Sequence, residues 1–515
     1  MTAPRTPQPG RRDAPLAMTG DGFRRLGHRL VERIAELLED LPGRPVTRDE
    51  SPEVLKALLG GAPSVPEGGA DAAALLDEAA TLLFDHSLFN GHPSFLGYVT
   101  ASPAPIGILA DFLASAVNAN TGAWRLSPIA SEIELQTIDW LADLVGFPRG
   151  GGLLVSGGNM ANIVALLAAR RAAATWDLRR DGVRPDDAPR LRVYATDETH
   201  TWLQKAVDLA GLGGACIHWI ATDEQQRMRP EALREAVAAD RAAGELPMLV
   251  VATAGTVSTG ALDPLGAIAD VCERERVWMH VDGCYGGVAA CVPDAPPPLA
   301  ELGRADSLAL DPHKWLYAPL EAGALLVRDR ERLRDAFAYH PPYYHFGQEA
   351  TNFVDLGPQN SRGFRALKVW LALRQVGRAG YAQMIGEDMR LARWLAGRVQ
   401  EHPELELATQ SLSITTFRFV PAELRARPAD AAAELDALNR EVLDRVQRSG
   451  AAFVSNAVVR GRYVLRPCIV NFHTDERALG ELIELVVRIG REVVASWGSG
   501  ARSVSPSRTG TTTRR

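Results

Sequence analysis

One lysine in the sequence has neighbours that suit covalent chemistry. Lys314 stands in the segment Asp311-Pro312-His313-Lys314-Trp315, which follows the apolar residues Leu308 and Leu310. Burial disfavours the ammonium form, so we expect the pKa of Lys314 to lie below roughly 10.4, the value of a free lysine. A neutral amine can attack an aldehyde and form a Schiff base. A lone lysine is more often a solvated surface charge, so this segment does not decide the function by itself.

A carboxylate follows the apolar run Trp278-Met279-His280-Val281. If this run is a strand of a parallel sheet, Asp282 emerges at the carboxyl edge, where ligands bind in open α/β sheets. A carboxylate there can keep a pyridine nitrogen protonated, which makes the ring a strong electron acceptor. The alternative is a helix cap or a structural salt bridge. The next residues, Gly283-Cys284-Tyr285-Gly286-Gly287, predict a flexible turn that admits a flat ligand.

Three other segments of interest follow predicted strands. Residues 153–162 predict a strand, a glycine-rich turn (Ser156-Gly157-Gly158-Asn159) and a helix N-terminus, whose N–H groups can bind a phosphate. A plain strand-to-helix turn would look similar. His200 follows the run 191–195 and can lie flat on an aromatic ring, although an isolated histidine is more often a satisfied polar residue. Residues 253–256, Thr-Ala-Gly-Thr, follow the run 248–252.

The elements that must position these residues alternate between apolar runs and amphipathic helices from about 90 to 330. The runs are apolar on both faces, which is typical of a mostly parallel sheet covered by helices on both sides. The clearest strands are 191–195, 248–252, 277–281 and 324–327. Beyond Phe364 we predict a long helix to about 399, interrupted near Gly377 and Gly380. Then come a strand (413–419), a helix (429–448), two strands (452–458 and 463–471) and a helix (475–494), typical of an α+β domain.

Two helices are predicted near the N-terminus, at 23–38 and 72–84, with a Pro/Gly-rich link (41–69) between them. The chain therefore divides into five predicted parts. These are a disordered N-terminus (1–20), a helical segment (21–90), a large domain (91–365), a small C-terminal domain (366–496) and a disordered tail (497–515).

Composition excludes several classes of function. The chain has 515 residues, 46% hydrophobic and 23% charged, with a formal net charge of −7. The acidic balance predicts no nucleic-acid partner and no anionic membrane surface as partner. The five cysteines form no Cys-x-x-Cys pair, so we expect neither a disulfide framework nor a metal site. No signal peptide or membrane span is visible, and we expect a cytoplasmic protein.

The ordered set of motifs resembles the group II pyridoxal-phosphate-dependent amino-acid decarboxylases, which include aromatic amino-acid, histidine, glutamate and 2,4-diaminobutyrate decarboxylases. The resemblance covers about residues 20–495. It rests on the segments Gly91-His92-Pro93, Tyr98-Val99-Thr100, SPIASE (127–132), SGGNMAN (156–162), His200, ATAGTVSTGALDP (252–264), HVDGCYGG (280–287), DPHKW (311–315), SRGFRALK (361–368) and LRPCIVN (465–471).

The resemblance implies a fold-type I enzyme, a homodimer whose active sites form at the subunit interface, with pyridoxal 5'-phosphate as cofactor. It assigns the internal aldimine to Lys314, the pyridinium partner to Asp282 and ring stacking to His200. Gly158, Asn159 and Asp311 match positions at or near the cofactor phosphate, Thr100 a further cofactor contact, and Thr256 the loop beneath the ring. Aromatic-acid members commonly have Asn where Asp311 stands, and a carboxylate beside a phosphate is unfavourable, so direct contact is not expected.

The implied reaction is decarboxylation of an L-amino acid to an amine and CO2. The resulting carbanion needs a proton from a positioned acid. In the family this acid is commonly a loop tyrosine, and counting back from Arg362 places Phe353 there. Tyr343, Tyr344, His345 or His313 can serve instead. In relatives that resemble aromatic aldehyde synthases, Phe at this place accompanies oxidative deamination to an aldehyde, which is the alternative outcome.

Substrate choice is less defined by the sequence. Residues 118–123 (Asn-Ala-Asn-Thr-Gly-Ala) replace the bulky apolar residues of aromatic-acid members, which favours a non-aromatic or polar amino acid. A third hypothesis, a cofactor-binding scaffold without catalysis, is disfavoured because both Lys314 and Asp282 are present.

Overall fold

The computed structural model describes residues 14–61, 64–183, 185, 188–340, 350–427 and 431–498. The chain divides into two units, one up to Phe89 and one from Asn90 onward. The first unit contains α1 (Gly20–Asp40), the 3-10 turn η1 (Leu41–Gly43), α2 (Pro52–Leu58) and α3 (Ala72–His86). Thr19 and Asp71 accept hydrogen bonds from first-turn N–H groups and so begin α1 and α3. The helix α2 lies inside the segment predicted as a link.

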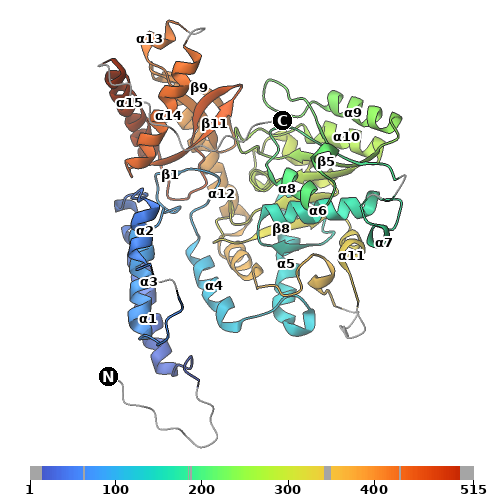
Figure 1. Cartoon of the computed structure of the whole chain (residues 1–515), viewed down its shortest axis with the longest axis horizontal. Helices are drawn as coiled ribbons and strands as arrows, with labels where there is room; N and C mark the ends of the chain where they lie inside the picture. Colours follow the sequence, from blue (N-terminus) through green and yellow to red (C-terminus); the bar gives the residue numbers. More distant parts are fainter. Residues whose placement is uncertain are drawn as a thin grey trace, which may run out of the picture. The chain divides into compact units, whose positions relative to one another are not determined.

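The larger sheet of the second unit is mostly parallel. Its order is β2-β8-β7-β6-β5-β3-β4, and only β8 runs against its neighbours among the strands described. The strands are β2 (Gly152–Val155), β3 (Leu191–Ala195), β4 (Ile217–Trp219), β5 (Leu246–Thr253), β6 (Trp278–Asp282), β7 (Ser307–Leu310) and β8 (Gly323–Val327). Their residues are almost all buried, because helices cover the sheet (Figure 1).

Helices join these strands and bury their own apolar faces on the sheet. They are α4 (Pro105–Val117), α5 (Pro128–Val145), α6 (Gly158–Ala173), α7 (Leu178–Asp181), α8 (Trp202–Leu209), α9 (Pro230–Ala242), α10 (Leu265–Glu275) and α11 (Glu331–Phe337), with 3-10 turns η2 (Trp124–Leu126), η3 (Gly214–Cys216), η4 (Gly287–Cys291), η5 (Pro297–Arg304) and η6 (Phe353–Asp355). The helix α6 contacts β2, β5, β6, β7 and β8. Its N-terminus therefore lies where these strands present their connecting loops.

A buried ion pair joins three segments that are distant in sequence. The guanidinium of Arg362 bonds to the carboxylate of Glu134 on α5, and their side chains are 2% and 0% exposed. Arg362 also donates to the carbonyl oxygens of Leu154 (2.6 Å) and Thr121 (3.2 Å). The ring of Phe353 packs against the same guanidinium, 4.5 Å from its carbon, and is fully buried. These contacts satisfy a charge that would be costly to bury alone.

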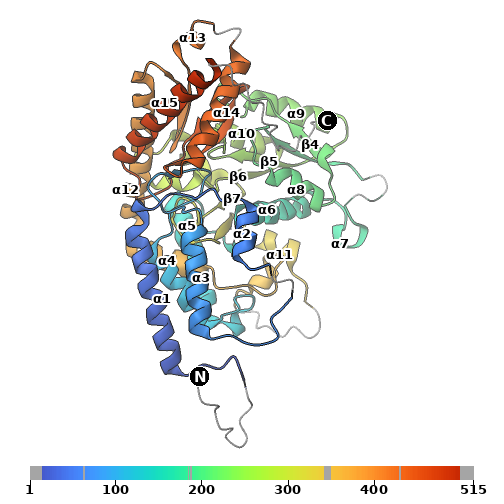
Figure 2. The same ribbon diagram turned by 60° about the vertical axis from the view of Figure 1, so that its left-hand side comes forward.

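A smaller sheet with the order β1-β11-β12-β10-β9 carries a second apolar core. Its strands are β1 (Phe95–Leu96), β9 (Leu405–Ser411), β10 (Ile414–Phe419), β11 (Phe453–Val459) and β12 (Arg462–Arg466), and its helices are α12 (Ala366–Glu401), α13 (Ala422–Arg425), α14 (Ala432–Arg448) and α15 (Glu476–Gly498). The helices α14 and α15 lie side by side against it in both views (Figure 2).

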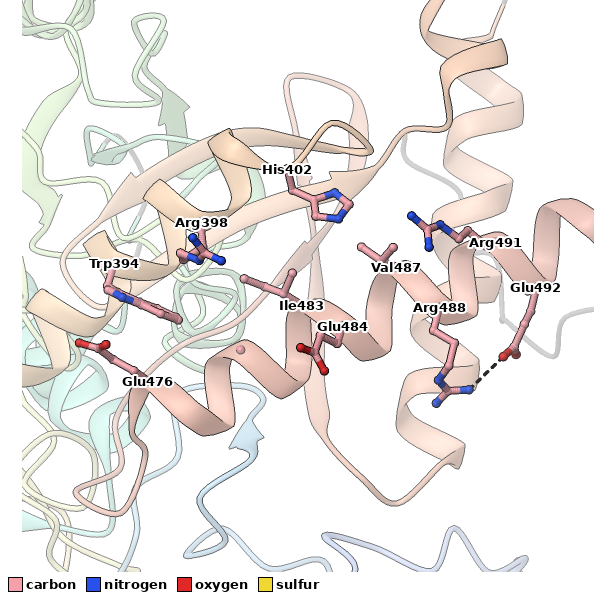
Figure 3. A pocket seen from close by; sticks show the side chains of 11 residues that line it. Trp394, Arg398, His402, Glu476, Ile483, Glu484, Val487, Arg488, Arg491 and Glu492 are labelled. Carbon is pink, nitrogen blue, oxygen red and sulfur yellow. Dashed lines mark hydrogen bonds and ion pairs between the residues drawn. The ribbon is translucent and has the colours of Figure 1, made fainter.

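A groove of about 910 Å³ lies between the last turns of α12 and the helix α15 (Figure 3). Trp394, Ile483 and Val487 form its apolar part. Arginines on its rim pair with nearby carboxylates, as Arg488 does with Glu492 at 2.9 Å. None of the residues predicted to do chemistry lines this groove.

The predicted fold class is confirmed, with a mostly parallel sheet, a smaller second sheet and N-terminal helices. The predicted break in the long helix is present, because Gly377 has a φ of 67° inside α12. The strand β9 was not predicted, and β12 ends at Arg466 rather than at 471, since the following Pro467 has no N–H for a ladder.

The ends of the chain are described only in part. Residues 1–13 and 499–515, parts of the predicted disordered termini, lie outside the described residues. Residue 20 belongs to α1, and residues 497 and 498 belong to α15. Within the described ranges, no helix combines the length and the apolar character that a bilayer crossing requires.

Candidate active site

Loops at the carboxyl edge of the large sheet enclose one cavity. It lies beyond the ends of β3, β5, β6 and β7 and beside the N-terminus of α6. Six of the nine predicted site residues line it: Gly158, Asn159, His200, Asp282, Asp311 and Lys314. The strand register explains their proximity, because Asp282 pairs with Ala309, and Asp311 and Lys314 follow shortly after.

Lys314 lies opposite a carboxylate inside this cavity. Its Nζ is 2.9 Å from Oδ2 of Asp311, whose side chain is 3% exposed. Burial lowers the pKa of Lys314, but the carboxylates of Asp311 and Asp282 raise it by more, so the net shift is upward. The expected lowering is therefore wrong for this arrangement, because sequence alone does not reveal that two carboxylates face the amine.

Asp282 is a buried carboxylate with several hydrogen-bond donors. Its Oδ2 accepts from Trp202 Nε1 at 2.8 Å and from Asn162 Nδ2 at 3.2 Å, and its Oδ1 accepts from the backbone N–H of Cys284 at 3.2 Å. Burial alone would raise the pKa of Asp282. The Lys314 ammonium and the bonds to Cys284 lower this pKa by more than burial raises it, so the net shift is downward. Asp282 is thus charged at neutral pH.

The N-terminus of α6 faces the cavity without a side-chain cap. Gly157 is the N-cap residue, and its φ of 147° favours glycine. A Cβ at Gly158 would collide with Cys284 Sγ and lie 2.6 Å from Asp311 Oδ2, so only glycine fits there. The first N–H groups of this 16-residue helix can therefore donate hydrogen bonds to a bound anion.

The two predicted histidines occupy different places. His200 lines the cavity, and burial lowers its pKa, so its ring is uncharged at neutral pH. His313 lies behind the cavity, where its Nδ1 bonds to the carbonyl oxygen of Ala322 at 2.7 Å. It lies close to Gly157, since a Cβ there would be 3.3 Å from His313 Cε1.

Two predicted contact residues do not line the cavity within the described chain. The hydroxyl of Thr256 accepts from the N–H of Ala261 at 3.1 Å and contacts Thr259 Oγ1, so it shapes its own loop. Its neighbours Gly255 and Val257 line the cavity instead. Thr100 is half-buried elsewhere.

Candidate proton donors and substrate contacts also differ from the sequence expectation. Phe353 lies in the core beneath Arg362 rather than on an open loop. Tyr343, Tyr344 and His345 lie outside the described residues. Residues 118–123 pack against the 360–363 segment, where Thr121 N donates to the carbonyl of Arg362, and they do not line the described part of the cavity.

Asn162, Glu198 and Cys284 line the cavity and Trp202 supports it, although the sequence assigned no role to any of them. Asn162 and Cys284 stand inside recognised motifs, and Trp202 follows His200 by two positions, so proximity in sequence was the available signal. Glu198 accepts from Gln226 Nε2 at 2.7 Å, and burial raises its pKa. In the part of the chain that is described, no cluster suited to a metal ion is present.

One buried acid supports the segment that carries Lys314. Oδ2 of Asp388, on α12, accepts from Trp315 Nε1 and from Tyr317 OH, both at 2.8 Å. Trp315 in turn stacks on Tyr285 with 5.0 Å between ring centroids. The backbone on both sides of the cavity is therefore anchored to the core through aromatic side chains.

Comparisons with known proteins agree with this arrangement. A family model described as the pyridoxal-dependent decarboxylase conserved domain matches residues 52–420. An aromatic-L-amino-acid decarboxylase of Bacillus atrophaeus is 33% identical over 94% of this chain and 98% of its own length. Tryptophan decarboxylase 1 of Oryza sativa subsp. japonica is 32% identical (93% and 95%), and phenylacetaldehyde synthase of Arabidopsis thaliana is 30% identical (91% and 96%).

Solved structures are similar over nearly the whole chain. The Oryza sativa TDC with PLP and tryptamine has a TM-score of 0.86 and 31% identity, covering 94% of this chain and 100% of that one. The Rhodiola rosea 4-hydroxyphenylacetaldehyde synthase has a TM-score of 0.82 and 26% identity, covering 93% and 99%.

The acid beneath the Lys314 segment generates a pH-dependent stability. Burial raises the pKa of Asp388 to about 7, although Tyr317 and Trp315 lower it by their hydrogen bonds. The folded state thus holds this proton more tightly than the unfolded state, where an aspartate has a pKa of about 3.9. The contribution to stability is present at low pH and is lost as the pH rises from about 4 to 7, by at most about 1.4 kcal/mol per unit.

We expect Asp388→Asn to flatten the fall of the thermal midpoint between pH 5 and 7, because the amide keeps an acceptor for both aromatic donors but cannot ionise. Midpoints measured across this range test the expectation. Asp444→Asn, at a carboxylate 44% exposed on α14, is the control and should leave the slope unchanged. Parallel curves for Asp388→Asn and the parent protein would contradict the assignment.

Proposed function

The chain belongs to the pyridoxal-dependent decarboxylase family, and we propose that it converts an aromatic L-amino acid to the corresponding amine and CO2, with Lys314 carrying pyridoxal 5'-phosphate. The observation that carries this proposal is that Lys314 and Asp282 line one cavity beside an uncapped helix N-terminus. An amine, a charged carboxylate and free N–H groups match the aldehyde, the pyridine nitrogen and the phosphate of the coenzyme.

The side chains of the cavity fit the coenzyme by their chemistry. Gly158 and Asn159, at the start of α6, are assigned to the phosphate, where Gly158 leaves room that a Cβ would fill. Asp282 is assigned to hold a proton on the pyridine nitrogen, and His200, uncharged, to lie against the ring. The coenzyme supplies an electron sink for the bond between Cα and the leaving carboxylate.

Asp311 is assigned to Lys314 rather than to the phosphate. Its Oδ2 holds the Nζ of Lys314 at 2.9 Å, and its Oδ1 is buried without a hydrogen-bond partner among the described residues. Asp311 therefore orients the amine and stabilises its proton whenever the amine is free. His313 keeps the turn before Lys314 in shape through the carbonyl of Ala322.

Three features support the choice of substrate class. The named relatives act, by their names, on aromatic amino acids or make aromatic aldehydes. Glu198 lines the cavity, and its carboxylate would repel an acidic substrate side chain. Residues 118–123, which suggested a polar substrate, pack against Arg362 and its neighbours instead.

A substrate panel with mass detection of products tests the proposal. We expect CO2 and amine from an aromatic L-amino acid, and a loss of on the order of 10³-fold or more in rate for Lys314→Ala, since the amine that tethers the coenzyme is gone. Borohydride should fix the coenzyme to Lys314 in the parent protein. An unlabelled Lys314, or no turnover of any amino acid, would refute the proposal.

Aldehyde formation is the second candidate, because two of the named relatives are aldehyde synthases. It consumes O2 and water and releases CO2, ammonia and hydrogen peroxide beside the aldehyde. The same panel separates the two outcomes: amine without peroxide supports the first, and aldehyde with equimolar peroxide supports the second.

Because Phe353 is buried beneath Arg362, we expect that its side chain does not decide between these products. We expect Phe353→Tyr to leave the amine-to-aldehyde ratio unchanged and to lower stability by about 1–3 kcal/mol, because it adds a hydroxyl to a fully buried ring beneath Arg362. Product ratios and chemical denaturation measure both effects. A shift of product toward amine would show that Phe353 reaches the reacting carbon.

We also propose a homodimer, with the active site at its interface. One face of α4 exposes Leu109 (55%), Leu113 (53%) and Val117 (66%), while the helix packs on α12 by another face. An apolar stripe of this kind, at spacings of four residues, is typical of a subunit contact.

We expect Leu109→Asp with Leu113→Asp to reduce the particle mass from twice 55.6 kDa to one chain in sedimentation, because two charges would be buried in the contact. Leu209→Asp, on α8 and 76% exposed, is the matched control and should leave the mass unchanged. A monomeric parent protein would contradict the proposal.

A further inference from the structure

A line of hydrogen bonds runs from Asp282 into the core of the large sheet. Asn162 Oδ1 bonds to His280 Nε2 at 2.7 Å, and His280 Nδ1 bonds to Ser307 Oγ at 2.8 Å. Trp278 Nε1 donates to the same Ser307 oxygen at 2.8 Å. Together with the bond from Asn162 to Asp282, these contacts cross β6 and β7 behind the cavity.

The bonds can all be satisfied in only one direction. A carboxylate only accepts, so Asn162 must present its amide N–H to Asp282 and its oxygen to His280. Burial lowers the pKa of His280 to about 4, so the ring is neutral and carries one N–H. That N–H points to Asn162, and Nδ1 then accepts from the Ser307 hydroxyl, which itself accepts from Trp278. Each group donates toward Asp282.

Trp202 adds an independent donor at the end of this line. Its indole N–H meets the same Oδ2 of Asp282, at 2.8 Å, and the side chain is fully buried. Its ring packs edge-on against His280, with centroids 6.0 Å apart at 88°. Oδ2 therefore has two side-chain donors, whereas Oδ1 accepts from the backbone N–H of Cys284.

We propose that Trp202 and the Asn162–His280–Ser307 line are positioning residues that set the basicity of Asp282, and through it the proton affinity of the bound coenzyme. This rests on the proposed function. Donors that converge on one oxygen draw negative charge from the carboxylate, and in a buried site this effect is not screened by water. Trp202, His280 and Ser307 are not among the residues that line the described cavity, so they act on the coenzyme through Asp282, whereas Asn162 also lines the cavity.

The charged and titratable groups that face Asp282 are few. They come from its own strand, from the turn after it and from the loops after β3 and β7: His280, Cys284, His200, Asp311 and Lys314. None of these groups is itself replaced by a substitution at Trp202 or Ser307. Trp202→Phe removes a donor to Asp282 directly, and Ser307→Ala removes the hydroxyl that bonds to His280.

The test uses the visible absorption of the holoenzyme as a function of pH. Trp202→Phe removes one donor, which leaves a more negative carboxylate and favours protonation of the coenzyme. We expect the midpoint of the absorbance titration to rise by about 0.5 pH unit or more. Ser307→Ala should shift it in the same direction by less, because its effect reaches Asp282 through His280 and Asn162.

Trp370→Phe is the matched control. This variant too loses one indole hydrogen bond, from Nε1 to Gln136 Oε1 at 2.7 Å, but this bond is not part of the line that leads to Asp282. The absorbance titration of Trp370→Phe should therefore match that of the parent protein. Unchanged midpoints in both Trp202→Phe and Ser307→Ala, with the coenzyme bound, would overturn the proposal even if activity fell. A parent protein without a visible band would refute the proposed function instead.

Discussion

A charged carboxylate beneath the cavity is the constraint on which the site depends. Asp282 is 7% exposed, and an isolated charge there would be neutralised by protonation. It stays ionised because donors from α6, from α8 and from the turn after β6 converge on it, together with the Lys314 amine. These donors come from elements that pack in the same core. The charge of Asp282 therefore depends on correct packing of the helices against the sheet.

The sheet register converts this constraint into a geometry. The strands β6 and β7 are parallel, and the pairing of Asp282 with Ala309 places the turn that follows β7 opposite the carboxylate. The N–H of Gly283 donates to the carbonyl of Ala309 at 3.0 Å, which extends the ladder past the strand end. Asp388 then fixes Trp315 from the far side. The strand pairing and the bond from Trp315 to Asp388 therefore fix the backbone segments that carry Asp282 and Lys314.

The sequence predicted the fold class and the loops that form the cavity, because each chemical residue follows an apolar run that ends at one edge of a parallel sheet. It could not predict that the hydroxyl of Thr256 bonds within its own loop instead of lining the cavity. Counting back from Arg362 in the sequence placed Phe353 over the site. The sequence position does not reveal that this ring packs in the core against Arg362, which is paired with Glu134. The predicted direction of the Lys314 pKa shift was wrong for a similar reason, because the sequence does not show that two carboxylates near the amine raise its pKa by more than burial lowers it.

The neighbours of Asp311 explain how an aspartate can stand where aromatic-acid members of the family commonly have Asn. A carboxylate close to a phosphate is unfavourable, yet here its Oδ2 faces the ammonium of Lys314 and lies against the small residue Gly158. An amide at this place could accept from Lys314 but would not offset its charge. With Asp282 and Glu198, the cavity contains three carboxylates and one amine, and α6 directs the positive end of its dipole toward them. An anionic group at that helix end would add a further negative charge, and the uncapped N–H groups of α6 are the donors that would stabilise it.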